Sequence, residues 1–552
     1  MKSLALVLVL VGLISAASAS AQSAPSAPAR APGPREHEAP PSSPEAPRNP
    51  AAPERPAPGA EPAAGGAAQK VRWDMTETPA VVTHHAITVR GQRLSYTATV
   101  GRLPIRDASG TTEALMFYTA YTLDGAAAER RPLTFAFNGG PGSASLWLHM
   151  GALGPRKVVL GPDGAMPAAP YRLEDNPDTP LDRTDLVIVD AIGTGFSRPA
   201  DSELGKKFWG VAGDVQAFGE FVRLYITRNE RWRSPLYIFG ESYGTTRAAG
   251  IAGYLVDRGI AFNGIGLLSM VLDFETLEIT RKNDLACVLT LPSYAMVAAY
   301  HHKLAPELEA DAAKTRAEVE RWAMTDYAAA LARGDALTGE ERRAVVEKLA
   351  RYTGLDTAIV DQANLRVTVP EFTHYLLADR RLRVGRLDGR YAAPDPIGFM
   401  DPQSGDPSSF ATTPPFTSAF NDYVRRELGY ETDMPYYVSA TQASTNPTEP
   451  GLFQRWDWGT ARDGFADTAT PLRSAMVKNP HMKVLVMEGY YDLATPYAAA
   501  NYTMDHLDLG PEYHANISFA TYDTGHMVYL RESGLGKLMR DFEDFIGRTT
   551  HP

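Results

Sequence analysis

The sequence of 552 residues is short of cysteine, of positive charge and of long hydrophobic runs. Its single cysteine, Cys287, excludes an internal disulfide, so the fold must be stabilised by burial alone. The formal net charge of -11 argues against nucleic acid as a partner, because phosphate binding needs a basic face. No stretch approaches the roughly 20 consecutive apolar residues of a membrane-spanning helix.

Cys287 itself has two interpretations. A lone cysteine is a candidate nucleophile, but this one lies in the apolar run Leu285 to Leu289. Such surroundings favour a small buried residue over a reactive thiol.

The N-terminus has the three parts of a secretory signal peptide over residues 1–21. Lys2 supplies the positive charge, Leu4 to Ile14 the apolar run, and Ala19-Ser20-Ala21 a small-residue cleavage site. A membrane anchor is the alternative, but eleven apolar residues are too few to cross a bilayer. The pattern therefore predicts export to the periplasm or the extracellular medium, with no membrane association after the signal is removed.

Residues 22–70 form a compositionally distinct segment with thirteen proline and fourteen alanine residues among 49 positions. Large apolar side chains are almost missing there, so this segment cannot build a core. We expect a disordered, extended linker. The rest of the chain carries the apolar material for a sizeable core, since 44% of all residues are hydrophobic.

From residue 71 to about 280 the hydrophobic pattern changes from alternation to short apolar runs. Alternation around a turn at Gly91-Gln92 predicts an antiparallel hairpin. The runs that follow predict buried strands, and residues 215–225 between them have helical spacing. The runs are Leu133 to Phe137, Leu186 to Val189, Leu236 to Phe239 and, much later, Val484 to Met487. This is the pattern of an α/β fold with a mostly parallel sheet covered by helices.

Residues 281–454 interrupt this rhythm and predict an inserted helical cap domain. Thr338 and Glu341 form a capping box at the start of one helix, and Gly354 ends it. The Pro-, Ser- and Thr-rich stretch from Pro402 to Thr417 predicts an exposed loop. The second part of the α/β core is expected at residues 455–552.

Ser242 lies in the pentapeptide Gly240-Glu241-Ser242-Tyr243-Gly244, between a predicted strand and a predicted helix. That context is the nucleophile elbow of the α/β-hydrolase fold, whose glycines permit a very sharp turn. A strand-ending turn with a buried serine remains the alternative, because the pentapeptide alone is weak evidence.

A serine nucleophile needs a histidine to take its proton and a carboxylate to orient the histidine. In this fold both follow the serine, the acid first. Asp492 follows the strand Val484 to Met487, and His526 follows the strand-like run Ile517 to Tyr522. Asp523 is the rival acid, although three residues before the histidine is an awkward reach.

Two backbone N–H groups are also needed to stabilise a developing oxyanion. One would come from Tyr243, directly after the serine, and the other from the loop Asn138 to Gly142. A glycine-rich loop can instead cradle phosphate, but this one lacks the Gly-Lys-Ser/Thr ending of a P-loop and the Rossmann spacing. A nucleotide site is therefore not expected. We also expect no other cofactor and no metal.

Taken together, several motifs in order resemble those of one family, the serine carboxypeptidases. They are Asn138 to Ser143, Gly151 to Pro155, Asn176-Pro177, Asp190 with Gly193 to Ser197, Gly240 to Gly244, and Gly525-His526-Met527. The resemblance extends over roughly residues 84–548 and implies the α/β-hydrolase fold.

The resemblance also implies roles for particular residues. Ser242, Asp492 and His526 would be the catalytic triad, and the N–H groups of Gly140 and Tyr243 the oxyanion hole. The C-terminal carboxylate of a peptide substrate would be bound by Asn138, Gly139 and Glu241. Glu241 beside an anion must be protonated to donate a hydrogen bond, which predicts peptide hydrolysis that is best at acidic pH.

Three positions depart from the family pattern. Ala136 replaces an expected tryptophan, Ser143 an expected cysteine, and Ala152 the expected partner glutamate. Without that partner, a lone Glu241 should be easier to ionise, which weakens the expectation of strict carboxypeptidase specificity. An esterase or acyltransferase using the same triad is one alternative, because fold and triad do not fix the acyl donor. A non-catalytic binding protein is the other.

Overall fold

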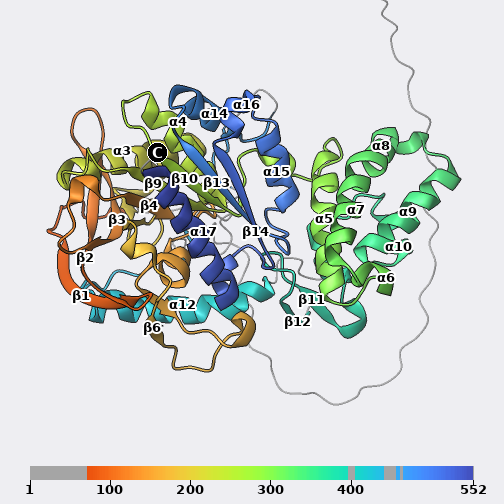
Figure 1. The fold of residues 1–552 in the computed structure, drawn as a ribbon, viewed down its shortest axis with the longest axis horizontal. Helices are drawn as coiled ribbons and strands as arrows, with labels where there is room; N and C mark the ends of the chain where they lie inside the picture. The colour runs from red at the N-terminus through yellow and green to blue at the C-terminus, as the bar shows by residue number, and fades with distance from the viewer. Residues whose placement is uncertain (1–70, 396–404, 441–454, 460–463, 551–552) are drawn as a thin grey trace, which may run out of the picture. The chain divides into compact units, whose positions relative to one another are not determined.

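The computed structural model describes residues 71–395, 405–440, 455–459 and 464–550. The chain divides into two units, Met1–Ala67 and Ala68–Pro552, and the second contains every described residue (Figure 1). The predicted signal peptide and most of the predicted linker form the first unit and lie outside the described residues.

A central sheet of ten described strands forms the core of the second unit (Figure 1). Nine of them follow the order β1-β2-β3-β7-β4-β9-β10-β13-β14, and β8 pairs with β3. Strands β1, β2, β3 and β7 pair antiparallel, and β7 through β14 pair parallel. The bounds are β1 Val81–Val89, β2 Gln92–Arg106, β3 Thr112–Leu123, β4 Leu133–Phe137, β7 Asp185–Val189, β8 Arg198–Pro199, β9 Leu236–Glu241, β10 Gly264–Leu268, β13 Lys483–Gly489 and β14 Ile517–Tyr522.

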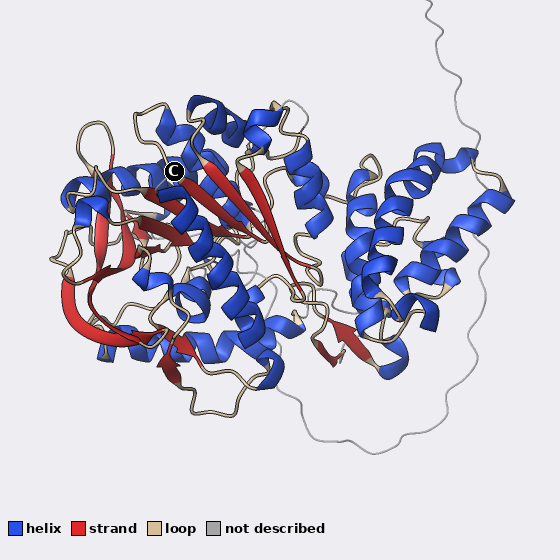
Figure 2. Cartoon of the chain, in the orientation of Figure 1, coloured by secondary structure: helices blue, strands red, loops and turns tan. Residues whose placement is uncertain are grey.

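Both faces of this sheet are buried, because successive side chains of its parallel strands enter different cores. Along β9, Ile238 faces one core while Tyr237 and Phe239 face the other. Helices of the first core are α3 Val211–Arg228, α4 Tyr243–Val256, α14 Ala469–Lys478 and α15 Tyr497–Asp505; those of the second are α12 Pro407–Arg426 and α17 Glu532–Thr550 (Figure 2). The shorter elements are α1 Leu146–Leu148, α2 Ser202–Phe208, α16 Pro511–His514 and the small pair β5 Arg156–Val158 and β6 Leu173–Asp175.

The strands expected from the sequence are confirmed, each matching or lying within β4, β7, β9, β13 or β14. The N-terminal hairpin is also present, but its turn is at Arg90-Gly91, since Val89 pairs with Gln92. Strand β10 went unpredicted because its sequence, Gly-Ile-Gly-Leu-Leu, carries two glycines that usually weaken a strand. The sheet between β9 and β13 is completed by this strand.

A block of helices follows β10 and has a hydrophobic core of its own (Figure 2). Its elements are α5 Leu285–Tyr300, α6 Pro306–Glu309, α7 Ala312–Trp322, α8 Ala328–Arg333, α9 Gly339–Thr353, α10 Thr357–Gln362, α11 Val369–Tyr375 and the hairpin β11 Leu382–Val384 with β12 Ala392–Pro394. The predicted capping box of Thr338 and Glu341 starts α9, and Gly354 ends it in the left-handed conformation. Helix α5 packs against α15 of the α/β core.

The predicted exposed loop from Pro402 to Thr417 is wrong in its described part. Residues 407–417 belong to α12, whose Phe416, Phe420 and Tyr423 are buried in the sheet's second core. Asp406 caps this helix and Pro407 occupies its first turn, where proline is tolerated. Burial of the aromatic face outweighs the two prolines inside the helix. Residues 407–440 therefore pack with the α/β core, and the helical block ends earlier than residue 454.

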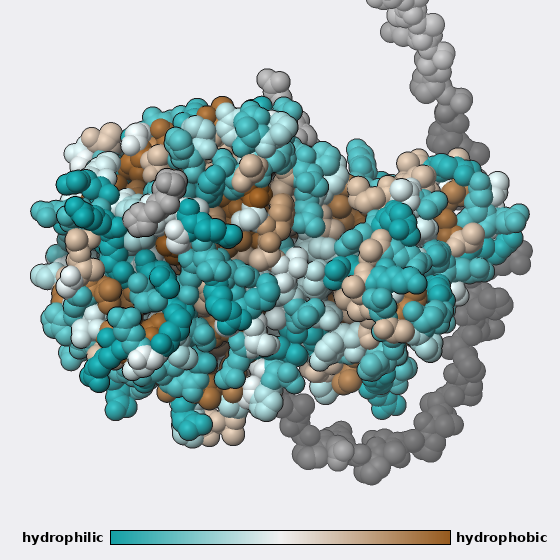
Figure 3. Space-filling view, in the orientation of Figure 1, coloured by the Kyte–Doolittle hydropathy of each residue, from teal (hydrophilic) through white to brown (hydrophobic). Residues whose placement is uncertain are grey.

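Polar residues cover most of the face of the molecule shown in Figure 3, and hydrophobic ones form small separate areas among them. In the described part of the chain, no helix is both long enough and apolar enough to span a bilayer.

Candidate active site

Ser242 occupies the sharp turn between β9 and α4. Its backbone has φ 60° and ψ -134°, a strained combination for a residue with a side chain. The turn is fixed to the end of β10, because the Ser242 N–H donates to the Leu268 carbonyl oxygen at 2.9 Å. A nucleophile elbow has this geometry, because the strain lifts the serine hydroxyl above the carboxyl edge of the sheet.

The turn requires glycine because other backbone lies against it. A Cβ atom added to Gly240 would lie 2.3 Å from the Gly244 carbonyl oxygen. A Cβ on Gly139 would lie 2.5 Å from the Tyr243 nitrogen, so the loop after β4 packs directly on the elbow. Gly140 in that loop has φ 102°, which glycine alone adopts readily. The two predicted oxyanion-hole residues, Gly140 and Tyr243, are thus held in neighbouring segments.

Asp492 and His526 are in direct contact. The Nδ1 atom of His526 lies 2.6 Å from Asp492 Oδ2, and both side chains are almost fully buried. Each comes from a loop at the carboxyl end of a parallel strand, Asp492 after β13 and His526 after β14. Neighbouring parallel strands bring these loops together, although 33 residues separate the two positions in the sequence.

The Asp492 carboxylate accepts further hydrogen bonds that fix its orientation. Its Oδ1 accepts from the N–H groups of Ala494 and Thr495, and its Oδ2 accepts from the Thr495 hydroxyl at 2.7 Å. Thr495 Oγ1 also lies 3.2 Å from His526 Nδ1. The rival acid, Asp523, is exposed and binds Arg390 through its backbone carbonyl instead.

The pKa of His526 results from opposing influences. Burial lowers it, but the charge and hydrogen bond of Asp492, together with the charge of Glu241, raise the pKa above its ordinary value. With Asp492 on Nδ1, the Nε2 atom is the one available to a nucleophile. Within the described ranges the Ser242 hydroxyl has no hydrogen bond to His526, a contact that commonly tightens only when substrate binds.

On the other side of Ser242, three side chains converge in what we term the Glu241 cluster: Glu241, Asn138 and Tyr529. The Tyr529 hydroxyl donates to Glu241 Oε2 at 2.8 Å. The Asn138 side chain lies close enough to Glu241 and Tyr529 to lower the pKa of both, and its Oδ1 accepts from the Leu148 N–H. Two of the three residues predicted to bind a carboxylate, Asn138 and Glu241, are therefore brought together, and Gly139 lies in the adjoining loop.

Burial raises the pKa of Glu241 to about 7. The charge of His526 and the hydrogen bonds from Tyr529 and Asn138 lower it, but they do not offset the loss of hydration. Even without the expected partner, Glu241 is harder to ionise than a free glutamate, because desolvation dominates. At mildly acidic pH this side chain is a neutral hydrogen-bond donor.

Tyr529 is the functional candidate that the sequence did not reveal. Its ring lies against Gly151, where an added Cβ would be 2.6 Å from the ring. Neighbouring Ala152 is fully buried and carries no group that could reach Glu241. The phenol therefore supplies a partner to Glu241 that Ala152 cannot supply. Nothing in the sequence marks this role, apart from the position of Tyr529 three residues after His526.

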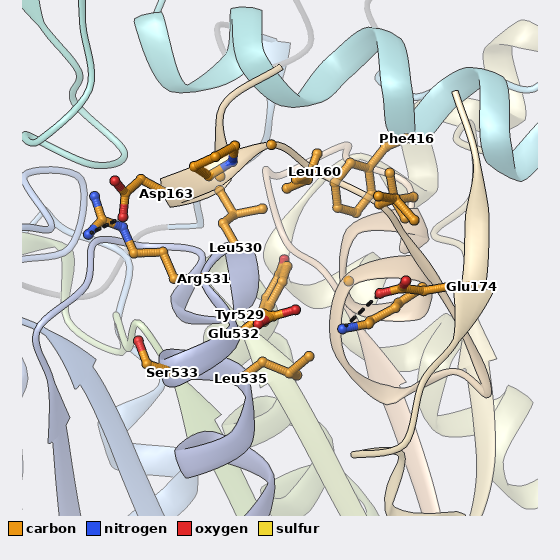
Figure 4. A pocket seen from close by; sticks show the side chains of 17 residues that line it. Leu160, Asp163, Glu174, Phe416, Tyr529, Leu530, Arg531, Glu532, Ser533 and Leu535 are labelled. Carbon is orange, nitrogen blue, oxygen red and sulfur yellow. Dashed lines mark ion pairs between the residues drawn. The ribbon is translucent and has the colours of Figure 1, made fainter. Parts of the chain in front are cut away.

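A cavity of about 480 Å³ borders the far side of Tyr529. Leu160 and Phe416 form part of its apolar wall, and ion pairs flank it, Asp163 with Arg531 on one side and Glu174 with Lys157 on the other (Figure 4). Tyr529 belongs both to the lining of this cavity and to the Glu241 cluster. None of Ser242, Asp492 and His526 lines the cavity.

Cys287 is buried, as expected, in the core of the helical block. Burial raises the pKa of its thiol to about 12, which makes the thiolate inaccessible at neutral pH. Among the residues that the structure describes, no group of three or more His, Cys, Asp or Glu side chains is placed to hold a metal ion.

Comparison with known proteins agrees with the motifs. The sheet order and the elbow define an α/β-hydrolase fold. Residues 96–271 match the family model described as serine carboxypeptidase, which confirms the resemblance and places the chain among the serine hydrolases. No curated protein matches the sequence.

Similar solved structures include a lipase in its open form, at 12% identity and TM-score 0.34, covering 82% of this chain and 100% of that chain. Another is the juvenile hormone epoxide hydrolase of the silkworm Bombyx mori, at 12% identity and TM-score 0.32, covering 82% and 79%. A third is esterase E22, at 11% identity and TM-score 0.35, covering 81% and 100%.

Proposed function

We propose that this protein is a serine carboxypeptidase that removes C-terminal residues from peptides. The observation that carries the proposal is the convergence of Glu241, Asn138 and Tyr529 beside the elbow of Ser242. A neutral carboxyl, a phenol and an amide are hydrogen-bond donors suited to a terminal carboxylate. Their burial strengthens such bonds, because the local dielectric is low.

In the proposed reaction, the Ser242 oxygen attacks the carbonyl carbon of the last peptide bond while His526 Nε2 takes its proton. The N–H groups of Gly140 and Tyr243 stabilise the oxyanion. The C–N bond then breaks, His526 gives the proton to the departing amine, and an acyl-Ser242 ester remains. Water, deprotonated by His526, hydrolyses that ester and restores the serine.

The pH dependence of peptide hydrolysis follows from two groups. His526 must be neutral to act as a base, so activity is lost at low pH, and its raised pKa moves that loss upward. Glu241 must be protonated to receive the substrate carboxylate, so activity is lost as pH rises through about 7. Peptide hydrolysis is therefore expected to be best between these two limits, close to neutrality.

The decisive experiment compares one peptide with a free C-terminus and the same peptide with an amidated C-terminus. The proposal expects release of the terminal residue from the free peptide at a much higher kcat/KM. Equal cleavage of the two would refute carboxypeptidase specificity while leaving a serine hydrolase in place.

An esterase or acyltransferase is the second candidate, since the same triad serves either reaction. Hydrolysis of a simple ester without a carboxylate measures that capacity. Labelling of Ser242 by a fluorophosphonate separates both enzymes from a non-catalytic binding protein, which would remain unlabelled.

We also propose export, on the sequence pattern of residues 1–21 alone. Expression of the full chain followed by N-terminal sequencing tests it. A mature N-terminus at Gln22 in the periplasm or medium is the expected result, and an intact Met1 in the cytoplasm would contradict it.

A further inference from the structure

Residues 386–391, which we term the strap, leave hairpin strand β11 of the helical block and cross to the loops that carry Asp492 and His526. The Arg386 carbonyl oxygen accepts from the Leu493 N–H at 3.0 Å. The Leu387 carbonyl oxygen accepts from the His526 N–H at 2.7 Å. The strap therefore forms backbone hydrogen bonds next to the acid and at the histidine itself.

Two side chains of the strap extend these contacts. The Asp388 carboxylate accepts from the Gly525 N–H at 3.2 Å and pairs with Arg390 at 2.5 Å. Arg390 also donates to the Asp523 carbonyl oxygen, and its guanidinium lies 5.0 Å from the centre of the Tyr491 ring. Both members of the pair are 4% exposed, so these contacts are shielded from water.

The strap is fixed on its other side by separate elements. Asp406, the cap of α12, accepts from the N–H groups of Arg386 and Leu387. His301, at the end of α5, donates from Nε2 to the Gly389 carbonyl oxygen at 2.7 Å. The strap is therefore bonded to both the α/β core and the helical block. Through its own hydrogen bonds it restrains the loops that carry Asp492 and His526.

We propose that Asp388 and Arg390 are positioning residues for the reaction, which keep the Asp492 and His526 loops in register through the strap. The proposal rests on the function proposed for the triad. A shift of about 1 Å at a reacting group costs on the order of 100-fold in rate, so a loosened strap lowers turnover without removing any catalytic group.

The test compares Arg390→Met with Arg231→Met. Arg231 forms an equally buried pair with Asp185, also 4% exposed on each side. That pair lies at the amino-terminal edge of the parallel strands, where β7 and β4 begin, away from the carboxyl edge that carries Ser242. The two variants thus differ in location, and each removes one buried arginine–aspartate ion pair, although Asp185 keeps a second pair with Arg131.

With a simple ester as substrate, Arg390→Met should lower kcat by about 100-fold and change KM little, whereas Arg231→Met should leave kcat near the wild-type value. Arg390→Lys, which keeps the charge but loses the planar fork, should fall between them. Equal loss in the two methionine variants, or no loss in Arg390→Met, overturns the proposal. If Arg390→Met does not fold, Arg390→Lys against Arg231→Lys decides by the same criteria.

Hydrogen exchange provides a readout that does not depend on activity. Peptides covering residues 489–495 and 523–527 should exchange faster in Arg390→Met and at the wild-type rate in Arg231→Met. If the wild-type protein hydrolyses neither ester nor peptide, the proposed function fails and exchange alone decides the role of the strap. Unchanged exchange in both peptides refutes it.

Discussion

The two sides of Ser242 each contain a buried carboxyl group, and their surroundings differ. Asp492 accepts hydrogen bonds from two backbone N–H groups, from the Thr495 hydroxyl and from His526. Glu241 is held by a phenol and an amide, and burial raises its pKa to about 7. The first carboxyl group is surrounded by hydrogen-bond donors, and burial keeps the second neutral below about pH 7.

In the function we propose, this difference separates catalysis from recognition. A charged Asp492 stabilises the imidazolium that forms when His526 takes a proton. A neutral Glu241 can donate to an anionic substrate, which a charged one would repel. Similar side chains therefore perform opposite tasks because their environments differ, a recurring arrangement in enzyme sites.

The largest expected effect comes from removing the nucleophile that both sides serve. Ser242→Ala should lower kcat by roughly a millionfold for ester and peptide alike, with fluorophosphonate labelling abolished. Cys287→Ala is the control and should keep activity and labelling, because Cys287 is buried in another core. Labelling that persists in Ser242→Ala would place the nucleophile elsewhere.

Asp492→Asn changes the acid of the proposed triad and leaves Glu241 intact. Because the histidine would lose its fixed tautomer and its counter-charge, kcat should drop by about 10⁴-fold for both substrates. Asp523→Asn, at the exposed rival position, should cost little. Steady-state kinetics with an ester suffices, and a larger loss in Asp523→Asn would reverse the assignment.

Glu241→Ala removes the carboxyl group of the Glu241 cluster and leaves Asp492 intact. Loss of a hydrogen bond to a charged group is worth about 1.5–3 kcal/mol, so kcat/KM for a free peptide should fall by roughly 10- to 100-fold. Ester hydrolysis should change little. Glu241→Gln, which donates without titrating, should retain peptide activity and abolish its decline above pH 7.

Glu543→Gln is the matched control for that pH profile. Burial raises the pKa of Glu543 to about 7 as well, but this residue lies on α17 and pairs with Arg90 of the β1–β2 turn, away from Ser242. The alkaline limb should therefore persist in this variant. If Glu543→Gln abolished the decline of peptide hydrolysis above pH 7 and Glu241→Gln did not, ionisation of Glu241 would not be the cause of that decline.

Tyr529→Phe should have the smallest effect. The Tyr529 hydroxyl lowers the pKa of Glu241 by donating to its carboxylate, so its removal should move the alkaline limb to higher pH, by up to about one unit. Tyr522→Phe loses a comparable bond to Asp541 and should leave the limb in place. A shift toward lower pH in Tyr529→Phe would contradict the assigned direction.

Much of the site follows from local sequence, because its backbone requirements are local. The elbow at Ser242 and the loop at Gly139 need glycine wherever main chains approach this closely, and both were recognised by that signature. Asp492 and His526 were found from strand ends and chain order. The fold was predictable for the same reason, since buried parallel strands are short apolar runs.

The features that were missed or wrong depend on distant packing. Tyr529 reaches Glu241 because Gly151 leaves room for its ring. Helix α12 forms through a proline-rich segment because the sheet buries its aromatic face. The strap at Asp388 contacts loops more than 100 residues away in the sequence.

The sequence by itself determined the class of chemistry, since a serine, an acid and a histidine in fold order admit few other uses. The tertiary structure alone decided the state of Glu241. Ala152 removes the expected partner from the sequence, but burial keeps the Glu241 carboxyl group neutral below about pH 7, and the Tyr529 hydroxyl orients it. Desolvation depends on everything packed around a group, which no local pattern records.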